Sequence, residues 1–149
     1  MNTKTLKGIT AAVSLLVGLG TATSALATST GGRTLGNGEH QIDAWSFECP
    51  ETHPIGQARV SDRANTNNAA AKMQLVLGKI GNPNQQVTDP DGEGPARSIF
   101  ATVASGSGEY TVVIKKTAVG VEDYIADVVC RDANNGLFNN PPLTLRIDQ

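Results

Sequence analysis

Apolar and polar residues alternate along several short stretches of this chain, and this two-residue period is the feature that most limits its fold. In residues 43–49, Trp45, Phe47 and Cys49 share one face, while Ser46 and Glu48 occupy the other. Successive side chains of a β-strand point to opposite sides of a sheet, so this pattern predicts a half-buried strand. Further candidate strands are residues 57–62, 72–80, 87–88, 97–104, 109–117, 121–130 and 143–147.

Seven or eight short strands separated by turn residues predict an all-β fold, a two-sheet antiparallel β-sandwich of the jelly-roll-like kind. Within residues 97–104 the alternation places Ile99, Ala101 and Val103 on the inward face. Residues 63–71 are ambiguous, because their alanines favour a helical turn and their asparagines favour a loop. We therefore expect no substantial helix.

The first 27 residues have the three parts of a secretory signal peptide. Lys4 and Lys7 give a positive start, residues 9–19 are apolar and uncharged, and Ala25-Leu26-Ala27 is a small-x-small cleavage site. A membrane-spanning helix needs about 20 apolar residues, more than this run supplies. The signal predicts a secreted or periplasmic protein, and no later apolar run is long enough to cross a bilayer.

Cleavage would leave about 122 residues, the length of one domain. Residues 28–39 are rich in Gly and Thr and are expected to form a flexible leader, followed by the sandwich domain at residues 40–149. The signal peptide carries two of the 12 basic residues and none of the 14 acidic ones, so the mature net charge is −4. Its only adjacent basic pair is Lys115-Lys116, which makes nucleic acid a poor candidate partner.

Cys49 and Cys130 are the only cysteines, and the alternation turns both toward the predicted core. An exported chain meets an oxidising compartment, where a lone pair of cysteines normally forms one disulfide. Closing a loop of about 80 residues stabilises the fold by roughly 4–5 kcal/mol in the chain-entropy model. The alternative is a copper-like site using Cys49, His53 and Met73, which would compete with the disulfide for Cys49.

Few residues point to catalysis. His40 and His53 are the only histidines, and neither lies in a sequence context that supplies a nucleophile and an orienting carboxylate. The Gly-x-Ser-x-Gly motif of many hydrolases is absent. We therefore expect no catalytic residues and a protein that is not an enzyme.

Calcium is the one cofactor that the sequence indicates. Asp89, Asp91 and Glu93 alternate in a glycine-rich turn, and calcium favours several carboxylate and carbonyl oxygens. The twelfth position of an EF-hand loop starting at Asp89 would be Phe100, where a bidentate Glu is required, so this is not an EF-hand. The alternative is a solvated turn that uses Asp, Pro and Gly for its backbone geometry alone.

Two short motifs, Asp43-x-Trp45-x-Phe47 and Gly108-x-Tyr110-Thr111-Val112, resemble the bacterial pre-peptidase C-terminal domain over roughly residues 40–130. The resemblance implies a jelly-roll-like sandwich, sometimes stabilised by calcium, that accompanies secreted enzymes or binds matrix. This chain departs from the pattern by standing without a catalytic domain and by carrying the Cys49/Cys130 pair.

Together these features predict an exported, non-enzymatic binding or surface-associated module whose partner is a protein or an extracellular matrix or surface component. A second reading is a filament subunit that donates its N-terminal strand to a neighbour. Residues 28–39 lack the alternating large apolar residues of such a strand. A third reading is a small secreted hydrolase.

We predict that the exported protein begins at Thr28, because Ala25-Leu26-Ala27 is a small-x-small cleavage site that follows the apolar run. Intact-mass analysis of protein recovered outside the cytoplasm measures this directly. A recovered mass that still includes residues 1–27 would contradict both the cleavage site and the inferred location.

Overall fold

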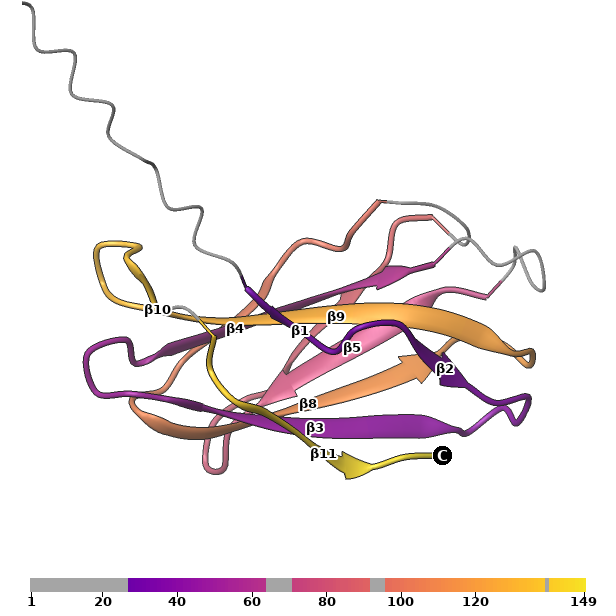
Figure 1. Cartoon of the computed structure of the whole chain (residues 1–149), viewed down its shortest axis with the longest axis horizontal. Coiled ribbons are helices and arrows are strands. Elements are labelled where there is room, and N and C mark those ends of the chain that lie inside the picture. Colours follow the sequence, from indigo (N-terminus) through magenta and orange to yellow (C-terminus); the bar gives the residue numbers. More distant parts are fainter. Residues whose placement is uncertain (1–26, 64–70, 92–95, 139) are drawn as a thin grey trace, which may run out of the picture.

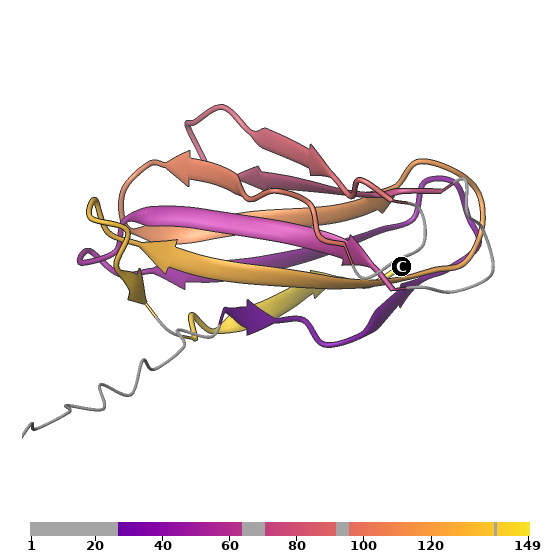
Figure 2. The ribbon, with the colours of Figure 1, turned by 90° about the horizontal axis from the view of Figure 1, so that it is seen from above.

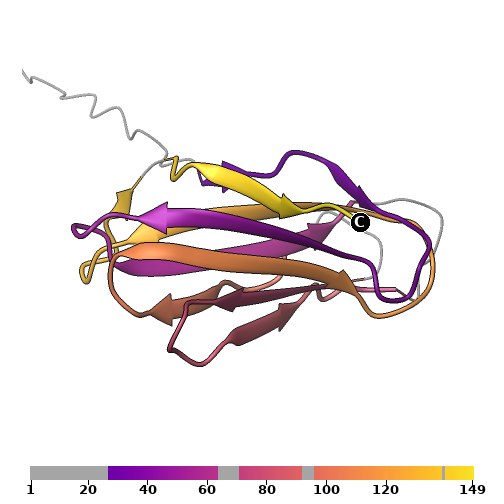
Figure 3. The ribbon, with the colours of Figure 1, turned by 90° about the horizontal axis from the view of Figure 1, so that it is seen from below.

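The computed structural model describes residues 27–63, 71–91, 96–138 and 140–149, and these form two stacked antiparallel β-sheets without a helix (Figure 1). The two-sheet antiparallel β-sandwich predicted from the alternation is confirmed. Figures 2 and 3 view the two sheets from opposite sides of the molecule.

Sheet A, with β4 and β9 in front in Figure 2, is built around these two long strands. β9 (Glu122–Arg131) pairs with β4 (Ile55–Asp62), which pairs in turn with β7 (Ala101–Ala104). The other edge of β9 is shared by three short strands, β1 (Thr28–Ser29), β2 (Arg33–Leu35) and β10 (Leu137–Phe138).

Sheet B, with β3 and β8 in front in Figure 3, has the strand order β11-β3-β8-β5-β6. Its strands are β3 (Ile42–Cys49), β5 (Met73–Gly78), β6 (Gln85–Thr88), β8 (Gly108–Lys116) and β11 (Leu143–Ile147). All eight strands expected from the alternation are therefore present, and the described residues add the three short strands β1, β2 and β10.

The core lies between the sheets and consists of the inward members of the alternating pattern. Its largest fully buried side chains include Tyr110, Tyr124 and Phe47, and the rings of Phe47 and Tyr110 stack at 5.5 Å. Gly56 on β4 lies under the Tyr110 ring, where an added Cβ would come within 2.6 Å of ring carbons. A side chain at this position would therefore push the two sheets apart.

The predicted disulfide between Cys49 and Cys130 is confirmed, and it joins β3 of sheet B to β9 of sheet A. Both cysteines are buried, and their Cα atoms are 5.5 Å apart. No free cysteine remains, so Cys49 is not available as the thiolate ligand of the copper-like alternative.

The structure differs from the sequence expectation at residues 28–39, which were expected to be a flexible leader. Thr28 and Ser29 pair with Val128 and Asp127 of β9, and Arg33–Leu35 pairs with Tyr124–Glu122. Leu35 is 0% exposed and belongs to the core. The unpaired edge of β9 thus gives this Gly- and Thr-rich segment a hydrogen-bonding partner that its own composition does not reveal.

Ile99 is a second difference, because its side chain is 80% exposed although the alternation placed it inward. The neighbouring Ser98 is buried instead and exchanges hydrogen bonds with Val60 of β4, through its backbone N–H and its hydroxyl oxygen. This local pairing reverses the inward and outward positions just before β7 begins.

Three sequence expectations lie on residues outside the described part: the signal peptide at 1–26, the ambiguous segment at 64–70, and Glu93 of the acidic turn. Within the described ranges, the chain forms no helix that is long and apolar enough to cross a membrane.

We predict that Leu35→Ala lowers the free energy of unfolding by about 2–4 kcal/mol, because it removes a fully buried side chain and leaves a cavity. Ile80→Ala is the matched control, since Ile80 is 100% exposed and its truncation should change stability by less than about 0.5 kcal/mol. Urea denaturation of both variants provides the comparison, and equal stabilities would mean that residues 28–39 do not contribute to the core.

Candidate functional site

The acidic turn predicted to bind calcium lies where β6 ends, close to the end of β4. Asp89 is only 1% exposed, and its two carboxylate oxygens accept hydrogen bonds from the backbone N–H groups of Asp62 and Asp91. Its own N–H donates to Met73 O at 2.9 Å. Asp89 therefore connects the ends of β4, β5 and β6.

The turn brings Asp89 and Asp91 together, while Glu93 lies outside the described residues. Burial raises the pKa of the Asp89 carboxyl to about 6; the Asp91 side chain acts in the same direction, and the backbone N–H groups of Asp62 and Asp91 oppose it. The Lys72 ammonium is nearby but donates to Pro90 O at 3.0 Å. Across the described part of the chain, no three His, Cys, Asp or Glu side chains gather in a way that could hold a metal ion.

A buried polar cluster explains the Asp-x-Trp motif of β3. Tyr124 of β9 donates its hydroxyl proton to Asp43 at 2.5 Å and accepts the indole N–H of Trp45 at 3.0 Å. The Gln149 backbone N–H donates to the other Asp43 oxygen at 3.2 Å. Burial and the bond to Asp43 raise the Tyr124 pKa, so the phenol stays protonated and the cluster acts as a structural link between the sheets.

Lys116 at the end of β8 is a second buried polar group. Its ammonium donates to the carbonyl oxygens of Gly36 and Gly120, which fastens the turn after β2 and the turn before β9. Burial lowers the pKa of Lys116, and the buried carboxylate of Glu122 opposes that effect. Both partners are backbone carbonyls of connecting turns, which indicates a role in holding the fold.

The two histidines do not form a recognisable catalytic arrangement. His53 Nδ1 lies 2.9 Å from Thr52 Oγ1, and its ring approaches Phe138 at 5.8 Å, whereas His40 is exposed. Among the described residues, neither histidine makes a hydrogen bond or ion pair with a carboxylate. In the described part of the chain, neither histidine is therefore held by a carboxylate as the base of a catalytic triad is.

An open hollow of about 430 Å³ lies on the outer face of sheet A. We call it the arginine groove and define it by three cations, one acid and an apolar wall: Arg59, Arg97, Arg131, Asp127, Phe100, Ile125, Val129 and Leu137. Ala27 and Ser29 lie at its N-terminal side. The volume is in the range of small-ligand sites.

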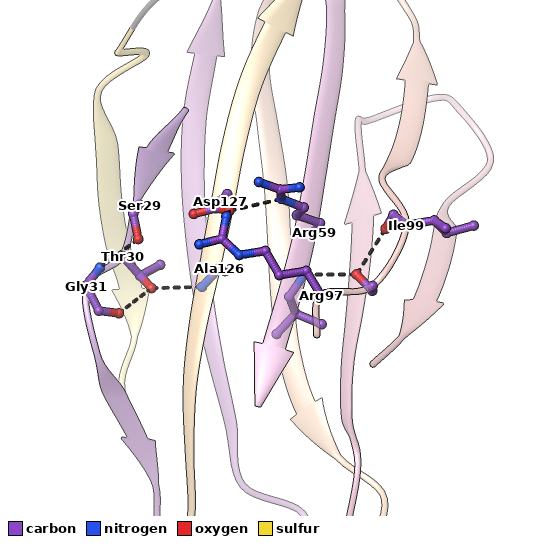
Figure 4. A network of polar contacts seen from close by, with 10 residues as sticks. Ser29, Thr30, Gly31, Arg59, Arg97, Ile99, Ala126 and Asp127 are labelled. Carbon is purple, nitrogen blue, oxygen red and sulfur yellow. Dashed lines mark hydrogen bonds and ion pairs between the residues drawn. The ribbon is translucent and has the colours of Figure 1, made fainter. Parts of the chain in front are cut away.

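The alternation of the strands positions the side chains of this groove. The inward residues of β9 face the core, so Ile125, Asp127, Val129 and Arg131 point outward. Arg59 of β4 pairs directly with Asp127 in the sheet register. Arg97 reaches Asp127 from the segment before β7, which the Ser98–Val60 hydrogen bonds hold against β4 (Figure 4).

The groove carries more positive than negative charge. Arg59 Nε lies 3.0 Å from Asp127 Oδ2, and Arg97 Nη1 contacts the same oxygen. The Asp127 side chain is 7% exposed, whereas those of Arg59 and Arg97 are 29% and 43% exposed. Two partly exposed guanidinium groups thus share one buried carboxylate, and each has further N–H donors besides the one that contacts Asp127.

The third cation, Arg131, is held by neutral groups. Its Nε donates to Gln57 Oε1 at 2.5 Å, and its Nη1 donates to Asn135 O at 3.1 Å. Arg59 also packs its guanidinium over the Phe100 ring at 4.6 Å. Three positive charges and one negative charge therefore line the groove, although the chain has a formal net charge of −2.

Sequence reasoning missed this groove. Arg59, Arg97 and Arg131 are separated by more than 30 residues each and form no local motif. The usable signal was the outward face of residues 121–130, where Ile125 and Val129 are apolar on a side expected to meet solvent.

We predict that Asp89→Asn flattens the pH dependence of stability between about pH 4 and pH 6. The folded-state pKa of about 6 lies above the ordinary value of 3.8, so the folded state binds more protons in this window. The contribution of Asp89 to the free energy of unfolding is therefore greatest below pH 4 and falls as the pH rises through 6. Urea denaturation at pH 4 and pH 7 measures the difference.

Asp148→Asn serves as the control, because Asp148 is an exposed carboxylate near the end of the chain. Asp89→Asn replaces one acceptor oxygen by an amide NH₂ group at both pH values, so the informative quantity is the change in the free energy of unfolding between pH 4 and pH 7. An unchanged pH dependence in Asp89→Asn would contradict the raised pKa.

Comparisons of the chain with family models, with curated proteins and with solved structures give no match.

Proposed function

We propose that this chain is an exported, non-enzymatic binding module and that its binding surface is the arginine groove. The carrying observation is an excess of guanidinium charge over an apolar wall, in a hollow that is open to solvent. Concave sites with an apolar lining and a few convergent polar groups are the usual form of ligand sites. The arginine groove has this form, and strands β4 and β9 of sheet A carry most of its charged side chains.

Two observations support export. The Cys49–Cys130 disulfide is compatible with an oxidising compartment, and residues 1–27 have the sequence pattern of a cleavable signal peptide. The positions of His40 and His53, away from any carboxylate partner in the described residues, favour binding over catalysis. The module would thus act by recognition outside the cytoplasm.

The filament alternative has less support. In such assemblies an incoming strand pairs with a free edge of the acceptor subunit. Here the edge of β9 is already paired with β1, β2 and β10 of the same chain. A subunit that donated its N-terminal strand to a neighbour would have to release β2, and with it the buried Leu35, from its own β9.

We also propose a weak structural calcium site at Asp89, Asp91 and Glu93. Asp89 and Asp91 are adjacent carboxylates, and the burial of Asp89 disfavours its negative charge. A bound divalent cation would relieve that cost, and we expect an affinity of about 10⁻⁴–10⁻³ M, the range of extracellular calcium modules. Calcium would then stabilise the fold without taking part in recognition.

The groove proposal predicts where ligands perturb the amide resonances of ¹⁵N-labelled mature protein. The probes are succinate, phosphate, a neutral oligosaccharide, an amidated cationic peptide and calcium ions, each added separately. We expect at least one organic or phosphate probe to shift amides of Ser29, Arg59 and Asp127, and to remain chemically intact. Calcium should shift the amides of Asp62 and Asp91 instead.

Ser46 and Thr144, on the outer face of sheet B, provide the internal control because they line a separate hollow there. Shifts confined to that face, or no shifts with any probe, would overturn the groove as the binding surface. Conversion of a probe to a product would favour the hydrolase alternative. Unchanged Asp62 and Asp91 amides in millimolar calcium would remove the calcium site.

A further inference from the structure

We infer that the arginine groove recognises an extended acidic segment of a partner protein, with two carboxylate side chains flanking an aliphatic one on the same face. This inference rests on the proposed function and adds the chemistry of the ligand. Three features of the groove carry it: the unbalanced arginines, their spacing along β9, and the aliphatic wall between them.

The excess positive charge of the arginine groove favours an anionic ligand. Asp127 supplies one carboxylate to Arg59 and Arg97, and Arg131 is bound only to an amide oxygen and a backbone carbonyl. Arginine presents five N–H donors in a planar fork, which matches the two oxygens of a carboxylate. Asp127 is almost fully buried and fixes Arg59 and Arg97 in place, so an incoming anion would meet donors that are already oriented.

The spacing favours an extended chain. The Arg59–Arg97 pair lies beside Asp127, and Arg131 is four residues further along the same strand. Same-face positions of an extended chain recur about every 6.6–6.8 Å, so two such repeats separate Asp127 from Arg131 on β9. Side chains i and i+4 of an extended bound segment are separated by the same distance. Val129 lies midway between Asp127 and Arg131, opposite the expected position of side chain i+2.

The apolar wall favours a peptide over a sugar polymer. Ile125, Val129 and Leu137 offer aliphatic contact, which suits an aliphatic side chain. Of the described residues that line the groove, Phe100 alone is aromatic, and the Arg59 guanidinium already lies over its ring at 4.6 Å. A uronate chain would share the carboxylate chemistry but would find that face of the aromatic ring occupied.

The test uses three capped peptides and the mature, disulfide-linked protein. The first is acetyl-Glu-Ser-Val-Ser-Glu-amide, which places both acids and the valine on one face of an extended chain. The second replaces both Glu by Gln, and the third, acetyl-Glu-Glu-Val-Ser-Ser-amide, keeps the charge but changes the spacing. We expect the first peptide to bind at least tenfold more tightly than either of the others in titrations followed by the Ser29, Arg59 and Asp127 amides.

Arg97→Gln should weaken binding of the first peptide about five- to tenfold, while Arg59 still pairs with Asp127 and keeps the fold intact. Arg131→Gln should weaken it similarly, because it removes the other end of the site. Arg146→Gln is the charge-matched control, since Arg146 lies on the outer face of sheet B beside Glu109, and it should leave affinity unchanged. Melting temperatures close to wild type would confirm that each variant is folded.

Equal affinity for the Glu and Gln peptides would overturn the inference, as would equal losses from Arg97→Gln and Arg146→Gln. Tighter binding of an oligouronate or of inorganic phosphate would replace the acidic peptide with that ligand. In each of these cases, shifts at the groove would leave the proposed binding surface standing. No shift at the groove with any ligand would overturn both proposals.

Discussion

The rest of the structure depends on the double connection between β3 and β9, the strands that link the two sheets across the core. The Cys49–Cys130 disulfide joins them at one end, and the Tyr124–Asp43 hydrogen bond joins them at the other. Positions 43 to 49 on β3 and 124 to 130 on β9 span the same number of residues. Because β3 and β9 are linked at both ends, the two sheets can neither slide nor rotate far relative to one another. Packing of apolar side chains alone would not impose that limit.

The two faces of β9 have different roles: one packs in the core, and the other lines the arginine groove. Tyr124, Ala126, Val128 and Cys130 face the core and hold the sandwich together. The outward residues, including Asp127 and Arg131, form the floor of the arginine groove. Since the same strand is fixed from behind by a covalent bond and a buried hydrogen bond, the outward groups have a rigid support. Preorganised donors of this kind lose little conformational freedom when a ligand binds.

Much of the fold follows from local alternation, and what the sequence did not predict depends on long-range contacts. The inward register of Cys49 and Cys130 could be inferred because each lies in a long, regular strand. The burial of Leu35 could not be inferred in this way. A single leucine among glycines becomes a core residue only because its segment pairs with the edge of β9. Ile99 turns outward because Ser98 pairs with Val60, and the groove exists only once β4, β9 and the segment before β7 come together.

The pairing of Thr28 with Val128 and of Leu35 with Glu122 has a consequence for the order of assembly. The chain is synthesised from its N-terminus, so β1 and β2 emerge long before the strand that receives them. Local contacts cannot hold them in the interval, and contacts between residues so distant in sequence slow folding. The first two strands of the sandwich can therefore pair only after β9 has been made.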